Sequence, residues 1–148
     1  LDLRKTRSVQ AGEPLMADGL YSTVNLQLKA PVGGETVPMR QIPDIMFSSG
    51  VIGSSIGIMP ENGHILAPCD GIVFEIADTS HALTFRTEDG MEILLLIGID
   101  TFTLNGDGLC PLVKEGETVT AGQPVMEADL EKISRAGLSP IIITVLCN

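Results

Sequence analysis

The sequence predicts an all-β domain, an antiparallel β-sandwich or barrel of the barrel-sandwich hybrid type, with a duplicated motif and short helices. Its apolar runs are short, and 16 glycines and nine prolines punctuate a chain of 148 residues. Val24–Leu28 alternates apolar and polar residues with the period of a strand. A weak repeat is also visible, since Lys29–Val37 echoes Leu66–Val73 and residues 113–125 have the same turn-rich style. Each repeated unit reads as strand, Pro-containing turn and strand.

The strands follow one another from Val24 onward. Residues 1–22 show little periodicity and are predicted to form a flexible tail or an interdomain linker. The β domain is expected to span residues 23–148, a length that supports one core. After the alternating segment at 24–28, apolar runs between turn residues predict strands near 35–40, 56–59, 64–67, 71–76, 82–87, 91–97, 117–119, 124–128 and 140–146.

Two segments are typical of short helices. Asp129–Gly137 has helical character, with Asp129 as the expected N-cap and Gly137 as the terminal glycine. A helical turn is also expected from Ile42 to Phe47, with Pro43 at its start.

Charge and composition limit the classes of partner. A formal net charge of −10 disfavours nucleic acid and anionic membrane surfaces. The charge either favours a partner with a basic face or only keeps the domain soluble. No run approaches the roughly 20 apolar residues of a membrane-spanning helix. Three scattered cysteines without a Cys-x-x-Cys pair argue against a zinc knuckle and favour a reducing, cytoplasmic setting.

The two histidines are the strongest candidates for chemistry. His64 lies in a turn signature, Glu61–His64, and is expected to be a hydrogen-bonded or surface residue. His81 begins a predicted strand. Two histidines exclude a three-histidine zinc site, and neither a phosphate-binding Gly-x-x-x-x-Gly-Lys loop nor a Gly-x-Ser-x-Gly elbow occurs. No metal or cofactor is therefore expected.

A loop that combines apolar residues with a carboxylate has two interpretations. Asp44, Ile45, Met46 and Phe47 are followed closely by Ile52. The segment is either ordinary core or a docking surface with an apolar centre and an acidic rim.

Several motifs together resemble the glucose-type IIA domains of the bacterial phosphoenolpyruvate:sugar phosphotransferase system. The resemblance covers roughly residues 24–146. It is carried by Ala30–Gly34, Ile42–Phe47 with Val51–Gly53, Leu66–Gly71, Thr79–Ala82, Gly90–Thr101 and residues 116–124. Biotinyl and lipoyl carrier domains share parts of this pattern. They need a lysine between the repeats, and none occurs there before Lys114.

The resemblance implies a role for each of these site residues. The family holds two histidines in a shallow apolar depression, and His81 matches the one that steadies the phosphoryl oxygens. Thr79 matches a threonine that hydrogen-bonds within the site. Leu96 occupies the position of the histidine that accepts the phosphoryl group, and leucine has no lone pair with which to attack phosphorus. Acidic residues near the depression match Asp44 and Asp100, and its apolar rim matches Ile45, Met46, Phe47 and Ile52.

The resemblance also implies partners and leaves alternatives open. The family relays a phosphoryl group from a histidine-containing phosphocarrier protein to the IIB domain of a sugar permease. This chain is either such a relay with an altered acceptor position, or a non-phosphorylatable binding module. In the second case it mimics the unphosphorylated family domain when it binds permeases and kinases. Phosphorylation of His81 alone is a third alternative. The family continues past the strand matching residues 139–145, so an uncovered edge is expected here, with weak self-association or reduced stability.

Overall fold

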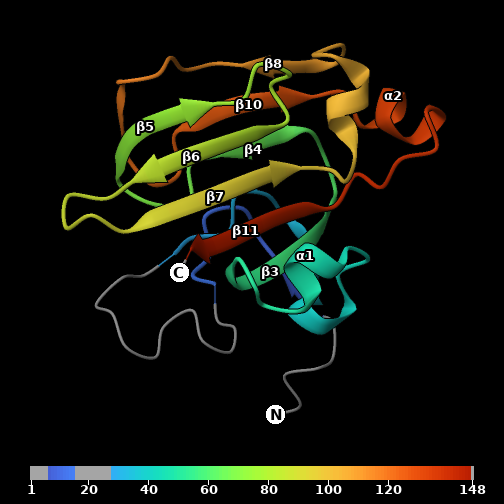
Figure 1. The fold of residues 1–148 in the computed structure, drawn as a ribbon, viewed down its shortest axis with the longest axis horizontal. Helices are drawn as coiled ribbons and strands as arrows, with labels where there is room; N and C mark the ends of the chain where they lie inside the picture. The colour runs from blue at the N-terminus through green and yellow to red at the C-terminus, as the bar shows by residue number, and fades with distance from the viewer. Residues whose placement is uncertain (1–6, 16–27, 148) are drawn as a thin grey trace.

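The computed structural model describes residues 7–15 and 28–147 of the chain (Figure 1). Within these residues the strands belong to two antiparallel sheets. The strands are β1 Ser8–Val9, β2 Gly34–Pro38, β3 Gly53–Pro60, β4 His64–Leu66, β5 Gly71–Ile76, β6 Ala82–Arg86, β7 Glu92–Ile97, β8 Leu109–Pro111, β9 Thr118–Val119, β10 Pro124–Ala128 and β11 Ile142–Cys147.

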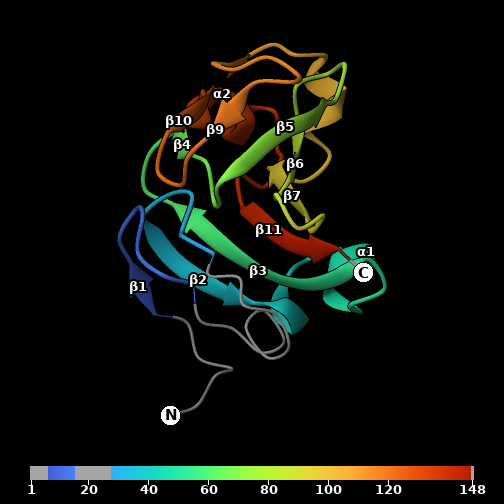
Figure 2. The same cartoon turned by 90° about the vertical axis from the view of Figure 1, so that its left-hand side faces the viewer.

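The two sheets form a sandwich, as the sequence predicted. The larger sheet has the order β1-β2-β3-β11-β7-β6-β5-β9, and the smaller one has the order β4-β10-β8 (Figures 1 and 2). Because β1 and β9 lie at opposite ends of this order, the described strands do not close a barrel. The main core lies between the sheets, where side chains of the larger sheet such as Phe85 and Leu95 pack with Ile65 and Met126 of the smaller one.

Four short helical segments complete the described part of the fold. They are the 3₁₀ helices η1 Met39–Gln41 and η2 Thr101–Leu104, and the α-helices α1 Ile45–Ser48 and α2 Leu130–Arg135. The predicted caps of α2 are present. The Asp129 carboxylate accepts a hydrogen bond from the Lys132 amide, and Gly137 follows the helix with φ of 77°. None of these helices is long and apolar enough to cross a membrane.

The strand β11 lies inside the larger sheet, where it pairs with β3 on one side and β7 on the other (Figure 1). Its backbone groups are therefore used within the sheet, and this strand offers no free edge for self-association. The uncovered edge expected from the family's additional strand stays a prediction.

Residues 7–15 also differ from the expectation of a tail. They form β1, which pairs with β2, and Val9 and Leu15 are buried in the main core. The reason is that a two-residue strand gives no periodic signal of its own and is fixed by its partner. The strand predicted at 24–28 lies outside the described residues apart from Leu28, which is buried. The domain boundary near residue 22 stays a prediction.

Candidate functional site

The strand β7 separates the main core from a second apolar cluster. Its odd-numbered residues, Ile93, Leu95 and Ile97, belong to the main core. Because side chains alternate along a strand, Leu94 and Leu96 lie on the opposite face and belong to the second cluster. The continuous apolar run of this strand is explained by burial on both faces.

Leu96 is a buried member of this second cluster. It is paired in register with Ala82 on β6 and with Ile143 on β11. Only 9% of its surface is exposed. A side chain at this position is therefore surrounded by hydrocarbon and almost excluded from water.

The segment between β2 and β3 packs against the same cluster. Ile42 is buried in it, and Phe47 and Ile52 pack against it while partly exposed. The structure thus brings together Leu96 and two residues of the predicted docking loop, although these lie more than 40 positions apart in the sequence. The residues of this loop divide between the core and the surface, and the docking interpretation stays a prediction.

The outward side of this loop carries exposed apolar side chains. Ile45 is 74% exposed and Met46 is 51% exposed. Val51, a little further along the chain, is also exposed. The Asp44 carboxylate caps α1 by accepting a hydrogen bond from the Met46 amide at 2.9 Å. One aspartate therefore fixes the short helix and places a negative charge next to its apolar residues.

His81 lies at the end of the turn that joins β5 to β6. A hydrogen bond of 2.5 Å joins its Nδ1 to the Thr79 hydroxyl. The ring packs against Phe102 in a T-shaped arrangement, with the centroids 5.9 Å apart. Partial burial lowers the pKa of His81 from its ordinary value, which favours the neutral imidazole.

The backbone ties His81 to the strand that carries Leu96. The Ile97 amide donates to the His81 carbonyl at 2.9 Å, next to the Ala82–Leu96 pair. Between Thr79 and His81, Ser80 has φ of 60°, in the left-handed region that few non-glycine residues adopt. This turn therefore holds Thr79 and His81 in a defined conformation beside β7.

The turn after β7 positions Phe102 next to His81. Asp100 has φ of 61°, and its carbonyl accepts hydrogen bonds from the amide and hydroxyl of Thr103. The buried Thr101 hydroxyl donates to the Ile97 carbonyl at 2.5 Å. Phe102 itself is 51% exposed. Sequence reasoning did not select Phe102, and the only signal was an aromatic residue directly after the Gly-Ile-Asp-Thr turn.

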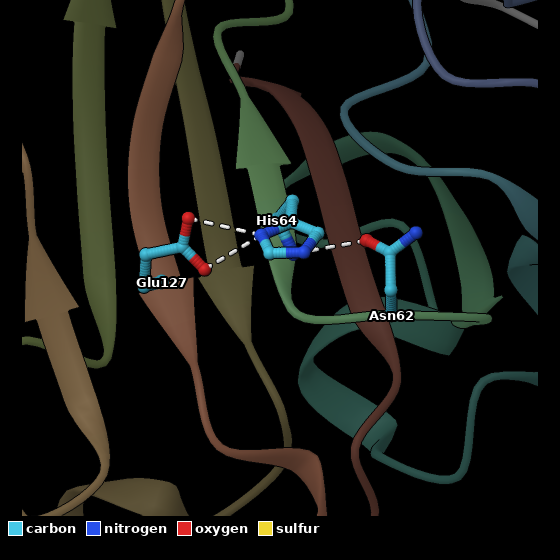
Figure 3. Close-up of polar contacts among 3 residues, drawn as sticks. All are labelled: Asn62, His64 and Glu127. Carbon is cyan, nitrogen blue, oxygen red and sulfur yellow. Dashed lines mark hydrogen bonds and ion pairs between the residues drawn. The ribbon is translucent and has the colours of Figure 1, made fainter.

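His64 is remote from this arrangement in the fold because it lies on the smaller sheet. Figure 3 shows it between Asn62 and Glu127. Its Nδ1 is 2.8 and 3.0 Å from the two carboxylate oxygens of Glu127, and its amide donates to Asn62 Oδ1 at 2.9 Å. His64 is thus a hydrogen-bonded surface residue, as the turn signature predicted.

The chemistry available at the site follows from these positions. The chain has two histidines, and only His81 lies beside β7. Leu96 offers neither a nucleophile nor a hydrogen bond. Among residues 7–15 and 28–147, no three His, Cys, Asp or Glu side chains gather in a group able to hold a metal ion. The site combines the second apolar cluster around Leu96, one imidazole whose pKa is lowered by burial, and aspartates that precede α1 and η2.

Comparison with known proteins identifies similar chains. A family model described as the phosphoenolpyruvate-dependent sugar phosphotransferase system, EIIA 1, matches residues 26–148. Among solved structures, the chain is similar to a glucose permease IIA from Mycoplasma capricolum, with a TM-score of 0.75 and 26% sequence identity. That match covers 100% of this chain and 84% of the other.

Proposed function

Since the chain belongs to the glucose-type EIIA family of the phosphoenolpyruvate-dependent sugar phosphotransferase system, we propose that it works in that system as a docking module that does not carry the phosphoryl group. In this proposal it binds the histidine-containing phosphocarrier protein and the IIB domain of a sugar permease in the cytoplasm. The same proposal includes binding to other permeases or kinases, in which the chain mimics the unphosphorylated family domain.

The residue that carries the proposal is Leu96. Transfer to an IIA domain forms a P–N bond to an acceptor nitrogen while the P–N bond to the carrier breaks. A leucine side chain has only C–H bonds and no lone pair, so this step has no acceptor at position 96. The proposal assigns Leu96 to the acceptor position because the Gly90–Thr101 strand and turn resemble the family's active-site strand.

The proposal takes the exposed apolar residues of the elements near this position as one docking face. Ile45, Met46, Val51 and Phe102 are exposed, and such side chains are typical of the centre of an interface. Asp44 and Asp100 add negative charge on the same two elements. In a chain of net charge −10, this face favours a partner with a basic surface around an apolar centre.

The test is phosphorylation in vitro. The chain is mixed with phosphoenolpyruvate, enzyme I and the histidine-containing carrier, and the phosphoryl mass increment is measured and located. We expect no stable increment on the parent chain. The Leu96→His variant regains an acceptor nitrogen and is expected to take up one phosphoryl group. Leu96→Gln is the control, because it adds polarity without a comparable nucleophile.

Binding is measured separately by titration of the parent chain with the unphosphorylated carrier. Retained binding with no label supports a docking module. A label on His81 of the parent chain contradicts the proposal, since it makes this histidine the carrier. Loss of both binding and labelling contradicts it as well, because a docking module must bind.

A further inference from the structure

Residues 9–15 repeat a segment from the other end of the chain. Val-Gln-Ala-Gly-Glu-Pro-Leu at 9–15 matches Val-Thr-Ala-Gly-Gln-Pro-Val at 119–125, with four of seven positions identical and apolar residues at both ends. The first copy lies outside residues 26–148, the part matched by the family model.

The two copies make the same backbone contacts. Each has a glycine with positive φ, 83° at Gly12 and 91° at Gly122. Each folds back on an Ala-Pro turn through a pair of hydrogen bonds of nearly equal length. In the first copy, the Gly12 amide donates to the Ala30 carbonyl at 2.8 Å and the Ala30 amide donates to the Glu13 carbonyl at 2.7 Å. In the second copy, the Gly122 amide donates to the Ala67 carbonyl at 2.9 Å and the Ala67 amide donates to the Gln123 carbonyl at 2.8 Å.

The strands that begin the two copies occupy equivalent places in the larger sheet. β1 is the edge strand next to β2, and β9 is the edge strand next to β5 (Figure 2). Val9 pairs with Gly34 and Val119 with Gly71, so the registers agree. The sheet order β1-β2-β3-β11-β7-β6-β5-β9 reads as two matching halves that meet between β11 and β7.

The order of the elements along the chain differs between the halves. In one half, the segment at 118–125 follows its sheet strands β5, β6 and β7. In the other half, the segment at 8–15 precedes β2, β3 and β11. The same place is thus reached through two different chain connections. The position of the segment is therefore determined by the contacts it makes with the sheet, and not by the chain connection that leads to it.

We propose that the outer edge of β2, together with the backbone of residues 28–30, is a peptide-binding site for segments of the form Val-x-Ala-Gly-x-Pro-Leu. Residues 8–15 fill it here, and a separate copy of that segment fills it too. Two buried anchors, Val9 and Leu15, supply the apolar contacts. Backbone hydrogen bonds supply the rest, as in the addition of a strand to a sheet edge.

The hydrogen bonds of this site run along the whole segment. The Arg7 carbonyl accepts from the Thr36 amide at 2.7 Å, and the Leu15 amide donates to the Leu28 carbonyl at 2.8 Å. In addition, the Arg7 amide donates to the Thr36 hydroxyl at 3.1 Å. These contacts are independent of the proposed docking face, so the two proposals can fail separately.

The binding test uses the full chain after it has folded. A recognition site for a specific protease is inserted between Gly19 and Leu20, and the folded chain is cut there. An isotopically labelled peptide of residues 7–15 is then added in excess, and native mass spectrometry follows which segment stays on the domain. A peptide carrying Val9→Asp is the matched control, because it buries a charge at the first anchor.

We expect the labelled peptide to appear on the cut domain and the Val9→Asp peptide to remain free. The proposal is overturned if the cut domain excludes the labelled peptide, if it binds both peptides equally, or if it precipitates once cut. Carrier binding by the cut domain is measured in parallel, so that a failure of the docking proposal is seen separately.

A second measurement on the uncut chain keeps the proposal testable. A methyl group added at Gly12 or Gly122 meets no atom within 4 Å, so Gly→Ala at either position costs only the left-handed backbone conformation. We expect Gly12→Ala to speed hydrogen exchange of the Ala30 amide about tenfold while Ala67 keeps its parent rate. Gly122→Ala should speed hydrogen exchange of the Ala67 amide while Ala30 keeps its parent rate. An unchanged Ala30 rate in Gly12→Ala overturns the assignment.

Discussion

At the scale of single residues, Leu96 and His81 divide the properties of the site between them. Leu96 is enclosed by hydrocarbon from β6, β7 and β11 and contributes packing. The polar ring of His81 is hydrogen-bonded to Thr79 through one nitrogen and makes a T-shaped contact with Phe102. The substitution Leu96→His discussed above therefore tests the proposed role of one residue while the Thr79 and Phe102 contacts of His81 are left unchanged.

The first prediction at this scale concerns the titration of His81. Burial lowers its pKa below the ordinary value of about 6.5, so the unfolded chain binds the proton more readily than the folded one. The stabilising contribution of neutral His81 is then complete above pH 6.5. It is lost as the pH falls from 6.5 through the lower pKa of the folded chain.

The measurement is an NMR titration of the His81 ring, together with the free energy of unfolding against pH. The variant His81→Gln has no group titrating here, so its stability should fall less steeply in acid than that of the parent chain. A folded-state pKa at or above 6.5 would show that desolvation does not dominate at this ring.

At the scale of elements, α1 shows how one side chain serves both structure and surface. The helix has only four residues and depends on its cap, because isolated short helices are not stable in water. Asp44 supplies that cap, while Phe47 on the same helix packs against the second cluster. Together these contacts hold Ile45 and Met46 towards solvent.

The prediction for this element separates the cap from the charge. Asp44→Ala removes both and is expected to weaken carrier binding about fivefold, which corresponds to a cap of about 1 kcal/mol. Asp44→Asn removes the charge but keeps an oxygen that accepts from the Met46 amide, so it should weaken binding less than Asp44→Ala. Titration calorimetry of the three chains decides the matter. Equal losses in both variants would assign the effect to charge.

At the scale of the whole molecule, the sequence predicted those parts that have a period of their own. Strands at 71–76 and 124–128 agree with the structure, because each begins at a Gly or Pro and continues with mostly apolar residues. β8 escaped prediction, since a three-residue strand ending in Pro111 has no period. Phe102 was missed because its contact with His81 joins two turns that are adjacent only after folding.

The same distinction explains the residues near the N-terminus. Val9 and Leu15 belong to the core through contacts with β2 and residue Leu28, and no local pattern predicts such contacts. The repeat of Val-x-Ala-Gly-x-Pro was nevertheless present in the sequence, and comparing residues 9–15 with 119–125 would have revealed it.

The prediction for the whole molecule concerns the second cluster. Ile143 is fully buried there and packs on the face opposite to the main core. Ile143→Ala is expected to lower the free energy of unfolding by about 2–5 kcal/mol, because it removes buried methyl groups and leaves a cavity. Met59→Ala, at an exposed position of β3, is the matched control and should cost far less. Equal losses in urea unfolding would show that this cluster is loosely packed.

The central position of β11 has a consequence for the time course of folding. This strand joins the two halves of the larger sheet, yet it comes more than 80 residues after β3 and more than 40 after β7. Until β11 is in place, β3 and β7 each lack a partner strand on that side. Bringing β11 to them closes long loops, which costs entropy before any contact compensates for it. We therefore expect refolding in milliseconds to seconds rather than microseconds, with the joining of the halves as the slow event.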